Sequence, residues 1–286
     1  MKLQSLQLYD FRSYETASVQ LHPGVNLIVG ENAQGKTNLL EAIVYLSSAR
    51  SPRARAEKEL ISFGKSECSI RADAFARSRE FLLEISLAAG RRRKILINKV
   101  PAKKGGELSD VLGAVYFCPE DLLLIRDGAA ARRRFMDDAL CQLRARYAQA
   151  LSDYHRAYEH KTRILRDSEE KPSLLSMWED FSLRMARIGA QIIRYRAYYC
   201  RRLLAAAAAV YSDIAPHEAL SGVYRTVSSV SDPFASAQQL ERELIDHVFR
   251  QKNAEIAAKS CLSGPHKDDL ELLLDGRSAS AFASQG

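Results

Sequence analysis

The sequence has 286 residues, of which 47% are hydrophobic and 27% charged, as expected of a soluble globular protein with one large domain or two ordinary ones. No apolar run approaches the length of a membrane span. The five cysteines are scattered and never spaced as C-x-x-C, which argues against a disulfide framework or a zinc site. The N-terminus has no apolar core or cleavage site of a secretion signal, so we expect a reduced, cytoplasmic protein with no membrane partner.

The formal net charge is +7, and most basic clusters lie between residues 51 and 134. A single cluster is usually a solvated turn. Several in one region favour a shared surface for an anion such as DNA, because phosphate contacts dominate DNA affinity. The candidate DNA contacts are Arg91, Arg92, Arg93, Lys103 and Lys104.

In the first part of the chain, alternating apolar residues predict two strands, around residues 6–8 and 19–21. The continuous apolar run 25–30 predicts a strand buried on both faces. A glycine-rich turn and a helix follow, the latter with Leu39, Leu40, Ile43 and Val44 at helical spacing. Short alternating segments between residues 66 and 117 predict an antiparallel meander of four strands, at 69–76, 80–87, 94–100 and 113–118.

The second part of the chain changes to helical periodicity. Apolar residues recur every three or four positions over 135–165 and again over 178–203, which predicts two long helices packed antiparallel across a break at 166–173. A strand at 222–230 and a helix at 236–258 follow. Residues 269–284 predict a hairpin, because Asp275-Gly276 favours a type I′ turn.

The segment from Gly30 to Thr37, "GENAQGKT", fits the pattern G-x-x-x-x-G-K-[ST]. Gly30 and Gly35 allow the backbone N–H groups to surround a phosphate, Lys36 places a cation at the β- and γ-phosphates, and the Thr37 hydroxyl can hold Mg²⁺. The alternative is that Gly-Lys-Thr merely starts a helix. The strand before the loop and the helix after it favour the binding of a nucleoside triphosphate.

Residues 6–43 around this loop resemble the N-terminal head of SMC-like ABC ATPases, specifically of the RecF family of bacterial DNA replication and repair proteins. The stretches 115–140, 263–276 and 282–286 resemble the same family in the same order, so the resemblance covers essentially the whole chain. It implies an α/β fold, a P-loop ABC-type ATPase head with a mixed or antiparallel β-meander and a long α-helical insertion. The implied parts are a head at 1–130, a mainly helical insertion at 131–258, and a return to the head at 259–286.

The resemblance also implies ATP and Mg²⁺ as cofactors. Lys36 would neutralise charge in the transition state, and Thr37 would ligate Mg²⁺. Arg12 would lie near the phosphates or the base, although it can also be read as a surface turn arginine. Ser284, in what resembles the front half of the ABC signature motif, would reach the γ-phosphate held by a second subunit. The further nucleotide-binding positions implied are Gly30, Glu31, Asn32, Ala33, Gln34, Gly35 and Asn38.

Three motifs each allow two readings. In "FCPEDL", Glu120 and Asp121 stand where relatives carry a glutamine that touches Mg²⁺ and the attacking water, so a carboxylate here could hold water or metal. Pro119-Glu120-Asp121 is also a good helix start, and we favour that alternative. In "GPHKDD", the residues 266–269 are either a charged turn or part of a nucleotide or dimer face. Arg132 to Arg134 can likewise face DNA or pair with acidic neighbours.

The family implies ATP-dependent dimerisation on DNA at single-strand gaps or junctions, followed by recombinase loading together with RecR and RecO. The alternative is a DNA-binding module that nucleotide stabilises without turnover. In this superfamily, ATP hydrolysis requires an apolar strand that ends in Asp and is followed by a catalytic acidic residue. No such element follows the hairpin, and the similar stretch "LLLIRD" at 122–127 lacks the second acidic residue. We therefore expect these residues alone to show little ATPase activity.

Overall fold

The computed structural model describes residues 1–102, 106–226 and 230–282. They form two compact units, residues 1–117 and 118–286, each of which is considered by itself. The division of the sequence at residues 130 and 258 stays a prediction. Within the described ranges, no helix is both long and apolar enough to cross a membrane.

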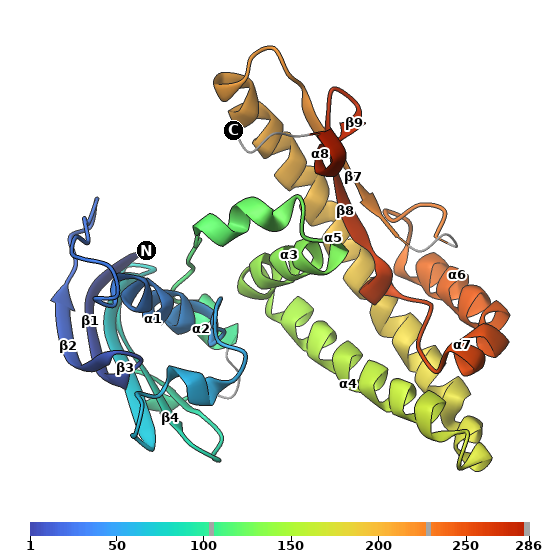
Figure 1. Cartoon of the computed structure of the whole chain (residues 1–286), viewed down its shortest axis with the longest axis horizontal. Helices are drawn as coiled ribbons and strands as arrows, with labels where there is room; N and C mark the ends of the chain where they lie inside the picture. The colour runs from blue at the N-terminus through green and yellow to red at the C-terminus, as the bar shows by residue number, and fades with distance from the viewer. Residues whose placement is uncertain (103–105, 227–229, 283–286) are drawn as a thin grey trace. The chain divides into compact units, whose positions relative to one another are not determined.

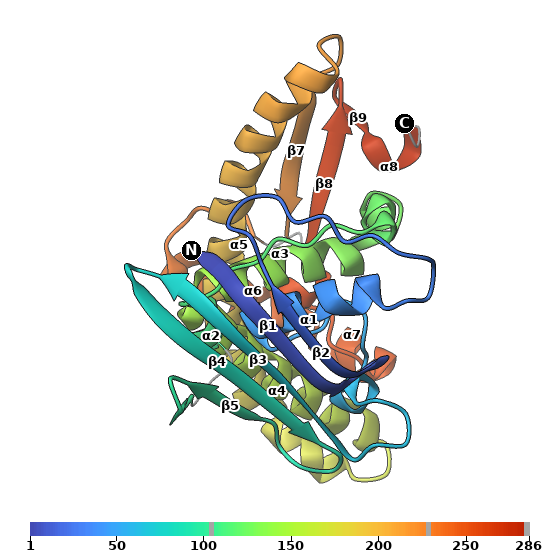
Figure 2. The same cartoon turned by 90° about the vertical axis from the view of Figure 1, so that its left-hand side faces the viewer.

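The first unit is built on an antiparallel sheet with the order β2-β1-β3-β4-β5-β6. Figure 2 shows its long strands side by side. The predicted first strand pair and the first two strands of the predicted meander are confirmed, whereas the third, predicted at 94–100, is divided by a turn at Asn98-Lys99 into two short paired strands. The strands are β1 (Lys2–Phe11), β2 (Tyr14–Gln20), β3 (Glu67–Ala76), β4 (Arg79–Ala88), β5 (Lys94–Ile97) and β6 (Val100–Pro101).

The core of this unit lies between one face of the sheet and α1 (Lys36–Ser48). Along β3 every second residue is buried, from Cys68 to Ala76, because side chains alternate between the two faces of a strand. These residues pack in one cluster with Leu39, Tyr45 and Leu46 of α1. Two short helical elements, η1 (Glu57–Leu60) and α2 (Gly106–Ser109), complete the unit.

Two predicted strands of this unit are wrong. Residues 25–30 and 113–118 have no regular secondary structure. Val25 and Val115 are 92% and 103% exposed. The physical reason is that a strand needs hydrogen-bonded neighbours, and no strand of the described ranges pairs with either segment. The apolar pattern that predicts burial is present, but in the run 25–30 only Ile28 packs against the core, while Leu27 and Val29 are 84% and 77% exposed.

The second unit is mainly helical. The break predicted at 166–173 is present but shorter, because α4 continues to Asp167 and a 3₁₀ turn begins at Pro172; Figure 1 shows α4 and α5 running antiparallel on either side of it, as predicted. The helices are α3 (Ala129–Leu143), α4 (Ala145–Asp167), α5 (Trp178–Ile214), α6 (Ala237–Arg250), α7 (Lys252–Ala258) and α8 (Ala279–Phe282), with short 3₁₀ turns η2 (Pro119–Leu124), η3 (Pro172–Met177) and η4 (Pro265–Lys267).

The predicted single helix over 135–165 is instead two helices, because Arg144 is extended, with φ −146° and ψ 101°. The apolar spacing continues through this break, so periodicity cannot detect it. The reason is tertiary: with the break, Asp137 of α3 and Tyr147 of α4 both reach the guanidinium of Arg196 on α5. The predicted helix over 236–258 is similarly divided at Gln251.

A small antiparallel sheet with the order β7-β8-β9 packs on α5. It consists of β7 (Leu220–Arg225), β8 (Asp269–Leu274) and β9 (Arg277–Ser278). The predicted type I′ turn is confirmed, because Asp275 and Gly276 both have positive φ, 48° and 76°. The hairpin is shorter than predicted, since residues 279–282 form the helical turn α8. The strand predicted at 222–230 ends at Arg225, and residues 227–229 lie outside the described residues.

Candidate nucleotide-binding site

The loop 30–35 between residue 29 and α1 has the backbone of an anion-binding loop. Gly30, Ala33 and Gly35 have φ angles of 154°, 66° and 90°. Such left-handed residues turn successive N–H groups to one side of the loop. Gly35 also lacks room for a side chain, since a Cβ there would lie 2.8 Å from Ser13 Oγ. The sequence pattern and the backbone therefore agree on a loop shaped for a phosphate.

Lys36, the first residue of α1, folds back over this loop. Its Nζ donates to the carbonyl oxygens of Gly30 at 2.7 Å and Glu31 at 2.6 Å. The ammonium group is thus held at the loop, beside the N-terminal end of a helix of 13 residues. Both the ammonium and the unpaired N–H groups of the first helical turn attract an anion.

The residues present fit a nucleoside triphosphate with Mg²⁺. Thr37 is exposed on the first turn of α1, next to Lys36, where its hydroxyl is available to a metal. Within the described ranges, no group of three or more His, Cys, Asp or Glu side chains could hold a metal ion. An ion bound here would therefore rely on phosphate oxygens and water besides Thr37, which is how Mg²⁺ is usually held with nucleotides.

Arg12 lies in the turn between β1 and β2, and its guanidinium is bound to α1. Nε and Nη2 donate to the carboxylate of Glu41 at 2.9 and 2.7 Å, and Nη1 donates to the carbonyl of Glu59 at 2.8 Å. The Glu41 side chain is fully buried. Arg12 thus neutralises a buried carboxylate and ties the turn to the helix that follows the loop. Its predicted contact with phosphates or base stays a prediction.

A cavity of about 740 Å³ lies beside the start of α1. Arg12, Ser13 and Asn38 line it, and Asn38 Nδ2 donates to Ser13 Oγ at 2.9 Å. The wall also contains residues that the sequence analysis missed, namely Lys58, Ser62, Phe63 and Lys65. Phe63 is fully exposed. In the sequence, the available signal was an aromatic residue next to a turn glycine and a cation, Phe63-Gly64-Lys65.

The candidate DNA contacts are only partly placed. Arg91 and Arg92 are exposed in the turn between β4 and β5. Arg93 instead forms an ion pair with Glu57 and donates to the carbonyl of Ala49 at 2.8 Å, so its guanidinium holds α1 to η1. Lys103, Lys104 and Ser284 lie outside the described residues.

The "FCPEDL" stretch is a helix start, as the alternative reading predicted. Pro119–Leu124 is a 3₁₀ helix, and the carboxylate of Asp121 accepts from the Cys118 N–H at 2.8 Å. Asp121 therefore caps this helix, whereas the side chain of Glu120 lies outside the described part of the structure.

The "GPHKDD" motif is held by buried contacts within the second unit. Asp268 is fully buried, accepts from the hydroxyl of Tyr224 and lies 3.7 Å from Nη1 of Arg196. Asp269 forms a two-point ion pair with Arg132, at 2.7 and 2.9 Å. These contacts bear out the pairing of Arg132 with an acidic residue, and they give the motif a structural role between β8, α3 and α5.

His266 of the same motif is enclosed by aromatic and basic groups. Its Nδ1 lies 2.7 Å from the Tyr154 hydroxyl, and its Nε2 lies 3.1 Å from the Cys261 carbonyl. Burial lowers the pKa of His266 to about 4, and the nearby cations Lys267, Arg133 and Lys161 lower it as well, against the contact with Cys261. His266 is therefore neutral at physiological pH.

A family model described as the RecF/RecN/SMC N terminal domain matches residues 2–259. The DNA replication and repair protein RecF of Lactobacillus johnsonii is 34% identical over all of this chain and 77% of its own length. That of Acetivibrio thermocellus is 30% identical over all of this chain and 78% of its own length.

A solved structure of "the recombination mediator protein RecF-ATPrS in RecFOR pathway" superposes with a TM-score of 0.94. It is 27% identical, over 99% of this chain and 76% of that one. The corresponding RecF-ATP structure gives a TM-score of 0.93, also at 27% identity, over 100% and 76% of the two chains. The fold is therefore shared with structures described as RecF-ATPrS and RecF-ATP.

Proposed function

Because the chain belongs to the RecF family of DNA replication and repair proteins, we propose that it binds ATP with Mg²⁺ at the loop 30–37. Binding of ATP then controls a homodimer that acts on DNA in recombinational repair. The protein would work in the bacterial cytoplasm.

The observation that carries this proposal is the position of Lys36. Its ammonium group is hydrogen-bonded to two carbonyl oxygens of the loop itself, at 2.7 and 2.6 Å. A triphosphate offers this cation stronger, charged acceptors in the same place. Lys36 and the N-terminal N–H groups of α1 would then bind the β- and γ-phosphates, and Thr37 would contribute a ligand to Mg²⁺. When bound, the metal ion neutralises charge that develops on the phosphates.

The cavity beside α1 is a suitable place for the remainder of the nucleotide. It lies next to the loop through Ser13, whose hydroxyl accepts from Asn38 on the first turn of α1. Phe63 offers an exposed ring on which a base can stack, and Lys58 adds a positive charge, whereas the ammonium group of Lys65 is paired with Asp10 at 3.2 Å. We therefore assign the base and ribose to this cavity and the phosphates to the loop.

The dimer and its DNA complex follow from the family and not from any contact within this chain. In that arrangement Ser284 would complete the nucleotide site of a second subunit, and Arg91 and Arg92 are the described candidates for contact with DNA at gaps or junctions. RecR and RecO would be the partners in recombinase loading, in keeping with the RecFOR pathway of the similar structures.

The test compares the chain with its Lys36→Arg variant, which keeps the charge but changes the shape of the donor group. Mass is measured by light scattering, and retention is measured on a gapped DNA duplex, each with and without Mg²⁺-ATP. We expect ATP to promote the dimer and DNA retention in the parent chain, and Lys36→Arg to reduce both. If neither mass nor retention responds to ATP or to the substitution, the protein is instead a DNA-binding module that does not depend on nucleotide.

A further inference from the structure

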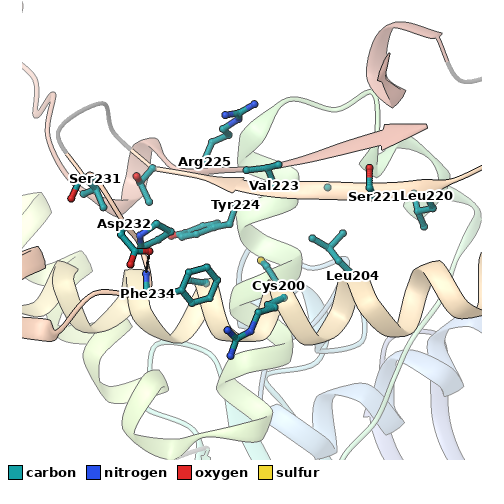
Figure 3. Close-up of a pocket in the computed structure, with 16 residues that line it drawn as sticks. Cys200, Leu204, Leu220, Ser221, Val223, Tyr224, Arg225, Ser231, Asp232 and Phe234 are labelled. Atoms are coloured by element: carbon teal, nitrogen blue, oxygen red, sulfur yellow. Dashed lines mark hydrogen bonds between the residues drawn. The ribbon is translucent and has the colours of Figure 1, made fainter. Parts of the chain in front are cut away.

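The turn between β1 and β2 contributes to both parts of the nucleotide site. Its residues Arg12 and Ser13 line the cavity beside α1, and the next residue, Tyr14, contacts the loop 30–35. The groove in the second unit, by contrast, lies between one helix and one strand, with Leu204 of α5 facing β7 (Figure 3). The turn in the first unit therefore joins the place assigned to the base to the place assigned to the phosphates.

Three successive side chains of this turn bind the start of α1. Their partners are spaced by three residues, so they lie on one side of the helix. The pairs are Arg12 with Glu41, Ser13 with Asn38, and Tyr14 with Gly35, the residue just before the first helical turn. The hydroxyl of Tyr14 donates to the carbonyl of Gly35 at 3.1 Å. Of the three contacts, the one with Tyr14 is made within the loop itself.

The turn is in turn fixed by the segment 60–62. The Arg12 N–H donates to the carbonyl of Leu60 at 2.8 Å, and the Ser62 hydroxyl donates to the carbonyl of Arg12 at 2.7 Å. Leu60 is fully buried, and the ring of Tyr14 packs against the core of the first unit. Because the ring is already held, its hydroxyl loses little conformational entropy when it donates to the loop.

The hydrogen bond from Tyr14 bears on the direction of one N–H group that a phosphate would use. The peptide between Gly35 and Lys36 is planar and trans, so its C=O and N–H groups point in opposite directions. The carbonyl of Gly35 also accepts from the N–H groups of Asn38 and Leu39, at 2.8 and 3.1 Å, and so points along α1. The N–H of Lys36 therefore points out of the N-terminal end of the helix, where an anion binds.

We propose that Tyr14 is a positioning residue for the triphosphate, an inference that rests on the nucleotide binding proposed above. Its hydroxyl holds Gly35 in the left-handed conformation, with φ 90°, so that the donors of the loop are in place before the nucleotide arrives. Without the hydroxyl, the loop occupies other conformations as well. The affinity for ATP then falls with the fraction of chains whose loop can bind phosphate. Adenosine has no phosphate, so its binding does not depend on that fraction.

The test compares Tyr14→Phe, which removes the hydroxyl and keeps the ring, with the control Tyr9→Phe. Tyr9 lies on β1 of the same strand pair and is 46% exposed. Calorimetry measures the affinity of each whole chain for Mg²⁺-ATP. Labelling with ¹⁵N-lysine gives two further measurements: the amide resonance of Lys36 without nucleotide, and a titration with adenosine followed at Lys58 in the cavity wall. Circular dichroism gives the melting temperature.

We expect Tyr14→Phe to weaken ATP binding about fivefold, the effect of losing one neutral hydrogen bond, and to leave adenosine binding unchanged. The Lys36 resonance of the nucleotide-free chain should move in Tyr14→Phe, because the adjoining carbonyl has lost a donor. Tyr9→Phe should match the parent chain in affinity, resonance and melting temperature.

Two results would overturn the proposal. The first is that Tyr14→Phe binds ATP as tightly as the parent chain. The second is that ATP and adenosine binding fall by the same factor together with the melting temperature, since Tyr14 would then support the whole unit and not the loop. Both results leave the nucleotide binding itself in place, provided that Lys36→Ala still loses affinity for ATP. If the parent chain does not bind ATP at all, the proposed function fails, and this inference fails with it.

Discussion

Replacing Asp137 by Asn tests whether the second unit is held together by one buried charge network. The carboxylate of Asp137 accepts from Nε and Nη2 of Arg196, both at 3.0 Å, and from the hydroxyl of Tyr147. The Arg196 side chain is only 3% exposed. Burial alone lowers the pKa of Arg196, but the neighbours Tyr147, Tyr224, Asp137 and Asp268 raise it well above its usual value, so the cation persists.

The expected loss is large because the substitution leaves a buried cation without its main partner. Breaking a buried ion pair in this way costs about 3–5 kcal/mol. Asp268, 3.7 Å from Nη1, and the Pro265 carbonyl, 2.7 Å from the same atom, still stabilise the charge. We therefore expect a loss near the lower end, about 3 kcal/mol. The control is Asp167→Asn, whose partner Arg163 is 82% exposed and which should change stability by less than about 0.5 kcal/mol.

Urea unfolding followed by the fluorescence of Trp178 measures this loss of stability in the second unit. Trp178 is the one tryptophan of the sequence and is fully buried in the second unit. For an m-value of roughly 2 kcal/mol/M, Asp137→Asn should lower the midpoint by roughly 1 to 2 M. The reasoning is refuted if Asp137→Asn unfolds within about 1 kcal/mol of the parent chain, or no earlier than Asp167→Asn.

The remaining predictions concern single side chains in either unit. The pKa of His266 is lowered to about 4 from 6.5, so its contribution to the free energy of unfolding is complete above pH 6.5. That contribution is lost as the pH falls toward 4. Unfolding monitored at Trp178 should thus show a loss of about 2 kcal/mol between pH 7 and pH 5, which His266→Asn reduces and the exposed control His217→Asn does not. Gly35→Ala places a Cβ 2.8 Å from Ser13 Oγ at a φ of 90°, so calorimetry should show ATP binding weakened about tenfold or more; unchanged affinity would contradict the loop geometry. Arg12→Met leaves the buried carboxylate of Glu41 without its two-point partner and should destabilise the first unit by about 3 kcal/mol; circular dichroism should show a lowered melting temperature, and an unchanged one would mean that the pair contributes nothing.

The parts of the fold that depend on local pattern could be predicted from the sequence. The alternation along β3 and β4 and the turn at Asp275-Gly276 each specify their own geometry. The loop 30–37 is of the same kind, because its glycines determine the backbone whatever surrounds it. The strand predicted at 25–30 is wrong for the opposite reason: an apolar run forms a buried strand only where other strands pair with it and cover it.

The contacts that join distant parts of the chain could not be predicted. No spacing in the sequence shows that Arg132 pairs with Asp269, or that Arg93 binds Glu57 instead of facing solvent. The break at Arg144 is also invisible, because it serves the contact of two helices with a third. The same holds for Arg201, whose guanidinium lies 4.8 Å from the ring of Phe234, a residue 33 positions away.

Titration of the chain with ATP and Mg²⁺ by calorimetry, alongside Lys36→Ala, tests whether the nucleotide binds at the loop 30–37. We expect one nucleotide per chain, and a loss of affinity of about a hundredfold when the ammonium group at the loop is removed, since hydrogen bonds between charged groups contribute about 1.5–3 kcal/mol each. Binding of ATP with equal affinity to the parent chain and to Lys36→Ala would contradict it, because the nucleotide would then lie away from the loop at Gly30 to Thr37.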